Sequence, residues 1–157
     1  MDAKMQDVFD AFSYGIYVIS VKDEGADNAM IASWVSQCSH DPPLLAVAIR
    51  KNRLSREQIM KTKAFCIGVL PAGSGGFMKR FKIPEWRKKF EGVESFRTDA
   101  GFLMPRRIIG WLDCKIAGIH ETGDHTLFIA EACAGGMVKE SKPMTTNAYS
   151  IRYRGMS

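Results

Sequence analysis

The chain has 157 residues, of which 46% are hydrophobic and 25% are charged. This composition excludes a disordered chain, and the length suits one domain better than two. The longest apolar runs, such as 44–49, are far shorter than the roughly 18–20 residues that span a bilayer. The first residues mix charges and contain no apolar signal segment. We therefore expect a single domain, residues 1–157, located in the cytoplasm without a membrane partner.

The net charge is +5, from 22 basic and 17 acidic residues. Such a surplus suits nucleic acid, an acidic protein or a small anionic ligand. The basic residues are scattered, however, and the densest group, at 79–82 and 87–89, is not part of any familiar nucleic-acid-binding motif. We therefore do not expect nucleic acid to be a partner.

The four cysteines, Cys38, Cys66, Cys114 and Cys133, are far apart in the sequence. None forms a CxxC pair, and no cysteine–histidine spacing matches a zinc site. Each lies in an apolar or strand-like stretch, which predicts buried free thiols. No metal site and no thioredoxin-type redox role are expected.

The first half of the chain contains one predicted helix and then short strands. Met5, Val8, Phe9 and Phe12 follow the i, i+3, i+4, i+7 spacing of an amphipathic helix over 4–12. Apolar and β-branched runs predict the strands that follow, and polar or proline-rich stretches separate them. The expected strands are 16–22, 28–37 and 44–49, with a hairpin turn at 23–27 and an interruption at 41–43.

The second half begins with a helix signal at Ser55, which forms an S-x-x-Q pattern with Gln58. This pattern predicts a capping box, with Ser55 capping a helix that ends near Lys61. Without regular alternation of strands and helices, the pattern favours a mostly β barrel over a parallel sheet. The remaining expected elements are a strand at 65–70, short helices and a loop at 73–90, two long strands at 107–121 and 126–139, and a polar, aromatic tail at 147–154.

Motifs of the common nucleotide-binding and hydrolase folds are absent: there is no G-x-G-x-x-G, no phosphate-binding P-loop and no G-x-S-x-G. The glycines at 73–76 fit a flexible loop. Of the three histidines, His125 lies at a polar turn between the two long strands, where a histidine is often only solvated. The residues alone therefore indicate a basic, mostly β domain with few titratable candidates.

Four stretches, 14–20, 28–37, 39–49 and 123–131, resemble the flavin reductase-like family, and the similarity covers about residues 6–140. The flavoredoxin branch is the most similar. The resemblance implies a split β-barrel with a few short peripheral helices that binds FMN non-covalently, usually at the interface of a homodimer. It implies an FMN-dependent oxidoreductase that passes electrons from NAD(P)H or a redox partner protein through the bound FMN.

The resemblance also assigns roles to residues along the first half of the chain. Asn28 and Trp34 match family positions near the flavin, and strand alternation would place both on one face. Ser55 matches a hydroxyl that contacts flavin, and a helix N-terminus there would favour the phosphate. The remaining candidates on these segments are Ser33, Gln37, Ser39, Arg50 and Asn52, with Lys51 and Arg53 adding charge.

Later candidates come from a basic and aromatic region and from the turn histidine. Lys79, Arg80 and Phe81 resemble a short family stretch that contacts the cofactor. Of Lys88 and Lys89, Lys89 is the favoured phosphate or ribityl partner because Phe90 follows it. His125 matches a histidine near the flavin ring, where it would orient the substrate or assist proton movement and is the catalytic candidate. Tyr149 or Tyr153 would supply a further aromatic group.

Alternatives stay open at this point. Trp34 would also suit a packed core, Ser55 a helix cap without a ligand, and the basic segment a solvated loop. The competing function is a non-catalytic split-barrel module that binds flavin or haem, and a basic nucleic-acid-binding protein is the more distant third possibility.

Overall fold

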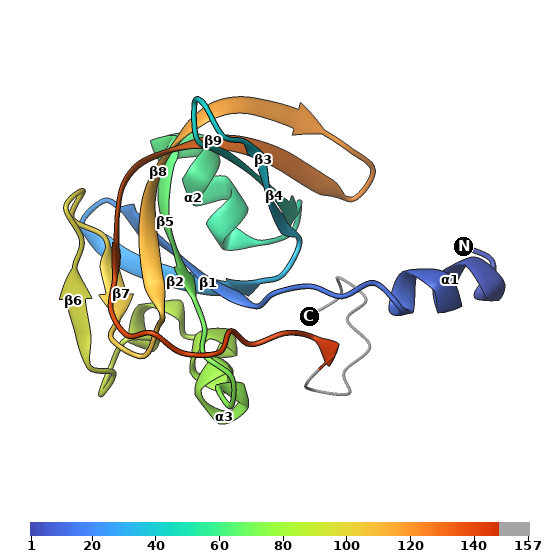
Figure 1. Cartoon of the computed structure of the whole chain (residues 1–157). Coiled ribbons are helices and arrows are strands. Elements are labelled where there is room, and N and C mark those ends of the chain that lie inside the picture. Colours follow the sequence, from blue (N-terminus) through green and yellow to red (C-terminus); the bar gives the residue numbers. More distant parts are fainter. Residues whose placement is uncertain (148–157) are drawn as a thin grey trace.

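Seven antiparallel strands curl into an open barrel in the computed structural model, which describes residues 1–147 (Figure 1). Their order across the sheet is β2-β1-β5-β8-β9-β4-β3. Strands β2 and β3 are the two edges, and no pairing between them closes the barrel within the described part. The strands are β1 (Tyr17–Asp23), β2 (Ala26–Ala32), β3 (Val35–Ser39), β4 (Leu44–Arg50), β5 (Ala64–Val69), β8 (Gly110–Glu121) and β9 (His125–Met137). The predicted mostly β, split-barrel class is confirmed.

Local sequence explains the first hairpin. Asp23 of β1 pairs with Ala26 of β2, so Glu24 and Gly25 alone form the turn. Both have positive φ, 52° and 77°, as a two-residue turn that follows the right-handed twist of the strands requires. The predicted turn at 23–27 is confirmed and is tighter than expected.

The main core fills the inside of the curl. Alternate residues of the strands point inward, such as Ile19 of β1 and Val47 of β4, both fully buried. Helix α2 (Leu54–Thr62) also lies inside the curl, where Ile59 packs with Phe65 and Phe128 (Figure 1). This helix is therefore part of the core rather than peripheral, because Ile59 is fully buried among side chains of the strands.

A second core lies on the outer face of β1 and β5, under residues 71–109. Val18, Cys66 and Leu70 point outward there and are buried beneath Phe81 and other side chains of this cover. The cover consists of α3 (Gly75–Met78), the 3₁₀ helices η1 (Lys79–Lys82) and η2 (Trp86–Lys88), and the hairpin of β6 (Ser95–Arg97) and β7 (Leu103–Pro105). The predicted short helices are confirmed, whereas the hairpin was not predicted, because its strands have only three residues each.

The hairpin is anchored to the barrel by the buried carboxylate of Asp113 on β8. The Thr98 hydroxyl donates to one carboxylate oxygen at 2.7 Å, and the backbone N–H of Ala100 donates to the other at 2.8 Å. Both oxygens are thus satisfied, as a buried charge requires. Asp113 therefore has a structural role.

Two sequence-based expectations are wrong in this part of the molecule. The strand expected over 28–37 is two strands, since β2 ends at Ala32 and β3 begins at Val35 on the opposite edge of the sheet. Only Ser33 and Trp34 lie between them. Buried thiols are confirmed for Cys66 and Cys114 and wrong for Cys38 and Cys133, which are exposed because they lie at irregular positions of β3 and β9.

Helix α1 (Ala3–Asp10) confirms the predicted amphipathic helix, and it projects away from the barrel (Figure 1). None of its residues is buried. The segment that follows α1 is attached to the barrel: the backbone N–H of Tyr14 donates to the Thr146 hydroxyl, and Gly15 forms a β-bridge with Thr145. Among residues 1–147, no helix is long and apolar enough to cross a membrane.

Candidate functional site

A hollow of about 410 Å³ lies between β2, the start of α2 and the segment 81–89. It gathers five of the residues predicted from the sequence. Of the other polar or aromatic lining residues, the sequence indicated Arg53 only as added charge and did not single out Lys82 or Trp86, although an aromatic residue within a basic stretch was a usable signal. The predicted lining residues are Asn28, Asn52, Ser55, Phe81 and Lys89, and the additional polar or aromatic ones are Arg53, Lys82 and Trp86.

Asn28 organises the buried wall of this hollow. Its amide nitrogen donates to the Ser55 hydroxyl oxygen at 3.3 Å and to Oε1 of Gln58 at 2.8 Å. The predicted capping box is therefore wrong: α2 begins at Leu54, its N-cap Arg53 makes no side-chain cap bond, and Ser55 and Gln58 bind Asn28 instead. Because the Ser55 oxygen accepts this bond, its own O–H is free to donate to a ligand.

Lys89 brings a buried ammonium group to the same hollow. The residue is only 8% exposed, and its Nζ donates to the backbone carbonyl of Ala29 at 2.6 Å. Burial, together with the nearby positive charge of Arg53, lowers the pKa of Lys89 to about 8. The site thus holds a cation that the protein alone stabilises poorly.

The cations around the start of α2 fall into two sets. Arg50 pairs with Asp124 at 3.4 Å, and Lys51 and Arg56 both pair with Glu121 at 3.1 Å. By contrast, the three cations that line the hollow, Arg53, Lys82 and Lys89, have no ion pair within residues 1–147, and no carboxylate lines the hollow. The N-terminus of α2 adds partial positive charge there. The arrangement suits an anion.

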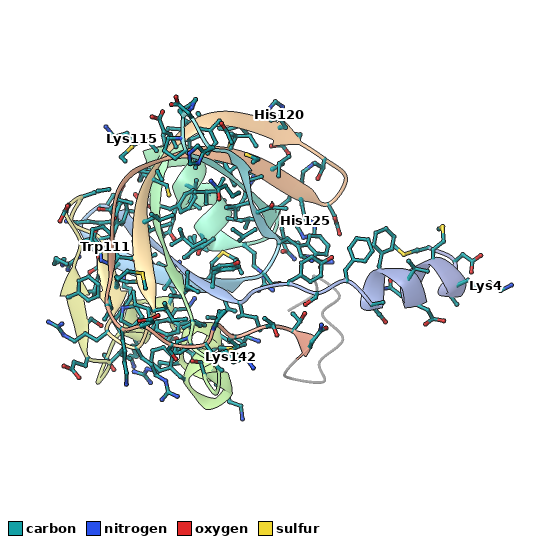
Figure 2. The ribbon with its side chains drawn as sticks, in the orientation of Figure 1. Lys4, Trp111, Lys115, His120, His125 and Lys142 are labelled. Atoms are coloured by element: carbon teal, nitrogen blue, oxygen red, sulfur yellow. The ribbon has the colours of Figure 1, made fainter. Side chains whose placement is uncertain are left out.

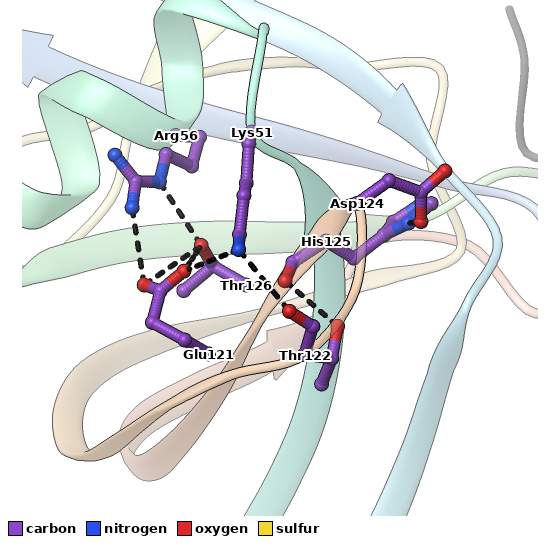
Figure 3. A network of polar contacts seen from close by, with 7 residues as sticks. All are labelled: Lys51, Arg56, Glu121, Thr122, Asp124, His125 and Thr126. Carbon is purple, nitrogen blue, oxygen red and sulfur yellow. Dashed lines mark hydrogen bonds and ion pairs between the residues drawn. The ribbon is translucent and has the colours of Figure 1, made fainter.

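Two members of the paired set, Lys51 before α2 and Arg56 in its first turn, connect this segment to the β8–β9 turn (Figure 3). Lys51 Nζ also donates to the carbonyl of Thr122 at 3.1 Å, and Arg56 Nε donates to the Thr126 hydroxyl at 3.0 Å. Hydrogen bonds from Lys51, Thr126 and Arg56 lower the pKa of Glu121, so it stays ionised at neutral pH. This network holds the turn that carries His125 against the segment that carries Ser55.

His125 and Trp34 form an aromatic pair at this turn. Their ring centroids are 4.5 Å apart with planes inclined by 31°, and the ring of Tyr14 lies 6.3 Å from that of Trp34. His125 is on the side of the barrel that faces α1 (Figure 2). It is 7% exposed rather than solvated.

The protonation of the His125 ring follows from its neighbour. Nδ1 lies 2.6 Å from a carboxylate oxygen of Asp124, and this hydrogen bond lowers the pKa of Asp124. An ionised carboxylate only accepts, so Nδ1 carries the hydrogen. Nε2 is then left to accept a hydrogen bond from a bound molecule.

Two buried donors beside the aromatic pair lack a partner within the described residues. They are the Ser33 hydroxyl, in the residue before Trp34, and Nε of Arg50, which is the β4 residue paired with His125. Buried donors without acceptors are rare in folded proteins, so they point to a ligand with acceptor atoms.

One tight turn separates the hollow from the aromatic pair. In this turn, the backbone N–H of Arg53 donates to the carbonyl of Arg50 at 3.1 Å.

Four further predicted site residues also do not line this hollow: Gln37, Ser39, Lys79 and Arg80. Gln37 lines a different, apolar hollow of about 510 Å³ and donates to the carbonyl of Ser39 at 3.2 Å. Lys79 is exposed on η1. Arg80 donates to the carbonyls of residues 88, 89 and 91, so it braces the loop of Lys89. The two candidate tyrosines, 149 and 153, are outside the described residues.

Comparison with known proteins gives the family. Residues 9–157 match the model of the flavin reductase like domain. The chain belongs to this family. The resemblance predicted from the sequence is therefore confirmed, and with it the class of flavin-dependent oxidoreductases.

Individual members show how the domain is used. The flavin reductase-like chain is 26% identical to a ferric-chelate reductase (NAD(P)H) of Archaeoglobus fulgidus, over 95% of this chain and 90% of the relative. It is 28% identical to diflavin flavoprotein A 1 of Synechocystis, over 88% of this chain but only 25% of that longer protein. A solved NADH:FAD oxidoreductase of Streptomyces globisporus shares the fold, with a TM-score of 0.84, 24% identity, and coverage of 92% of this chain and 90% of that one.

Proposed function

We propose that this protein is an FMN-dependent oxidoreductase of the flavin reductase or flavoredoxin type. The observation that carries the proposal is the unpaired cationic hollow beside the aromatic pair. FMN needs donors for a phosphate, polar partners for its ribityl chain and pyrimidine edge, and an apolar or aromatic wall for its ring. The site offers all three kinds of surface, so the residues present fit this cofactor.

The phosphate would lie in the hollow, bound by Arg53, Lys82 and Lys89 and by the Ser55 hydroxyl. The three cations lack carboxylate partners and are therefore not neutralised by the protein, as described above. This charge favours FMN over riboflavin. It is also our reason to propose FMN rather than the FAD of the Streptomyces enzyme's name.

The ring would lie against Trp34 and His125, with the Ser33 hydroxyl and Arg50 Nε donating to its polar edge. When bound, the flavin supplies the capacity to accept and pass on electrons. Trp34 excludes water from one side. His125, oriented by Asp124, presents Nε2 to the reacting end, where it holds or moves a proton. It does not act as a nucleophile.

The electron donor is proposed to be NAD(P)H, as in the name of the Archaeoglobus relative, or a redox partner protein. A cytoplasmic location is the corresponding proposal for the protein. Neither donor requires a separate nucleotide-binding domain, because donor and acceptor would both exchange electrons directly with the bound flavin.

We also infer that the protein works as a homodimer. Five of the nine large apolar side chains that are exposed in residues 1–147 lie on or beside α1. A projecting helix with so much exposed apolar surface and no buried residue indicates an interaction site. A second copy of this chain is the occupant we propose, because the family commonly places flavin at a subunit boundary.

Absorbance and mass spectrometry test the cofactor. We expect the purified protein to be yellow, or to become so when FMN is added, and released cofactor to have the mass of FMN at one per chain. A colourless protein that binds no flavin, or one that binds only FAD, contradicts the proposal. A haem spectrum would favour the alternative, a split-barrel binding module without turnover.

A further inference from the structure

We propose that the hollow selects a doubly charged phosphate monoester, and that Lys89 makes this selection by taking up a proton as the dianion binds. The inference rests on the proposed function and concerns the phosphate end of that site. It adds two features to the binding reaction: the phosphate must carry two negative charges, and Lys89 takes up a proton from the solvent when the phosphate binds.

The geometry around Lys89 leaves its ammonium group without a negative neighbour. An ammonium has three N–H donors, and one of them binds the carbonyl of Ala29. The described residues provide no hydrogen-bond partner for the other two. Since the side chain is almost fully buried, water satisfies them poorly.

Every element packed around Lys89 contributes a neutral or positive group to the hollow. Strand β2 provides the neutral Asn28, the start of α2 provides Arg53, and η1 provides Lys82. The acid on β2, Asp27, accepts two hydrogen bonds from the Arg97 guanidinium, at 2.6 and 2.9 Å. Glu85 and Glu91, the acids nearest in sequence, do not line the hollow. Within residues 1–147, no carboxylate is thus placed to hold the proton of Lys89.

A bound dianion provides the missing negative charge. Without it, burial and Arg53 keep the pKa of Lys89 at about 8, so the side chain is mostly protonated at pH 7 and mostly neutral at pH 9. A phosphate dianion beside the amine raises this pKa. Binding at pH 9 therefore takes one proton from the buffer and forms an ammonium–phosphate pair, whereas binding at pH 7 takes up almost none.

The charge on the phosphate also predicts the order of affinity of the different flavins. A phosphate monoester has a second pKa of about 6 and is a dianion at pH 7. Each phosphate of a dinucleotide is a diester-like group with one charge, and riboflavin has none. FMN should therefore bind more tightly than FAD, and riboflavin should bind most weakly and without taking up a proton.

Isothermal titration calorimetry in two buffers with different ionisation enthalpies tests the inference on the intact protein. We expect FMN binding to take up about 0.9 proton at pH 9 and close to none at pH 7. Above pH 8 the FMN affinity should fall by up to about tenfold per pH unit. Riboflavin should show no such uptake at either pH.

Variants at two adjacent lysines separate this explanation from a general charge effect. Lys89→Arg keeps the positive charge but does not titrate in this range, so FMN binding should lose its proton uptake and its pH dependence between pH 7 and 9. Lys89→Met should bind FMN more weakly than the unaltered protein and without proton uptake, whereas its affinity for riboflavin should change little. Lys88→Met is the matched control, because this neighbouring lysine is exposed and outside the hollow, and it should behave as the unaltered protein.

Equal proton uptake for FMN and riboflavin at pH 9 would overturn the inference and leave the proposed function intact, because flavin still binds. So would a Lys89→Arg protein with unaltered pH dependence. If neither flavin binds the unaltered protein, both the inference and the proposed function are wrong.

Discussion

At the scale of single residues, Ser55 is the most direct probe of the phosphate end. Ser55→Ala removes a donor to a charged phosphate, a bond worth about 1.5–3 kcal/mol. We expect FMN to bind roughly 10- to 150-fold more weakly. Fluorescence titration measures this effect.

The stability of the Ser55 variant should change little, because Ser55 is not a helix cap and Asn28 keeps its bond to Gln58. Ser36→Ala is the matched control, since this exposed serine of β3 donates only to a neighbouring carbonyl. Unchanged FMN affinity in Ser55→Ala would place the phosphate elsewhere.

His125 should affect the reaction rather than the affinity. His125→Asn removes the ring nitrogen that we place at the reacting end, so the rate of flavin reduction by NAD(P)H should fall on the order of 100-fold. FMN affinity should change little, because the phosphate contacts are intact. Anaerobic stopped-flow measurements check the rate. His120→Asn, at an exposed position of β8, should leave both quantities unchanged. Loss of FMN binding in His125→Asn, with a normal rate when loaded, would contradict this assignment.

At the residue scale, the fold brings together several of the candidates taken from the sequence, and their binding role stays a prediction. The resemblance led to Asn28, Asn52, Ser55, Phe81 and Lys89, which line one hollow although they come from four segments. The role of Ser55 in capping was wrong, because a tertiary contact with Asn28 outweighs the local S-x-x-Q pattern. Ion pairing was not predictable either. The sequence shows neighbouring basic residues at positions 50, 51 and 53, and nothing in it indicates which of them has an acidic partner. In the structure, Arg50 and Lys51 form ion pairs and Arg53 does not within residues 1–147.

At the scale of elements, α1 supplies the test of the dimer. Removing residues 1–12 should convert the protein from a dimer to a monomer of about the chain mass, 17.5 kDa for the intact chain, because it removes five exposed apolar side chains. Light scattering measures the mass. Phe9→Ser should weaken the dimer in the same direction, since burying a phenylalanine is worth about 1.5–3 kcal/mol.

Lys4→Ser is the control for the α1 variants, because it alters an exposed polar residue of the same helix. It should leave the dimer unaltered. A monomer in the intact FMN-loaded protein, or a dimer that survives removal of 1–12, would be evidence against α1 as the contact.

Elements with strong periodicity were predictable and short ones were not. The continuous apolar run of β4 and the i, i+3, i+4, i+7 spacing of α1 were enough to predict those elements from the sequence alone. Strands β6 and β7 have three residues each, and their position depends on hydrogen bonds to Asp113, which is distant in sequence. The break at Ser33 and Trp34 was also missed, because no glycine, proline or charged residue interrupts the sequence there.

At the scale of the whole molecule, the barrel class followed from the lack of alternating helices and strands, but the position of α2 did not. Its sequence is mostly polar, with Ser55, Gln58 and Ile59 as its buried residues. A polar helix is normally expected at the surface. Here the buried polar side chains are turned toward Asn28, so the helix is able to fill the barrel end and also form a wall of the ligand hollow.

The unclosed seam of the barrel has a consequence for stability. In the part of the chain that the structure describes, the edges β2 and β3 do not pair with each other, and the chain connects them through Ser33 and Trp34. A molecule held by Trp34 on one side and by Arg50 and Lys89 on the others would connect parts of the sheet that the backbone does not. By mass action, a ligand at 100 times its dissociation constant adds about 2.7 kcal/mol to the free energy of unfolding. The cofactor would thus serve as a structural component of the fold, and the supply of flavin in the cell would set how long the protein survives proteolysis.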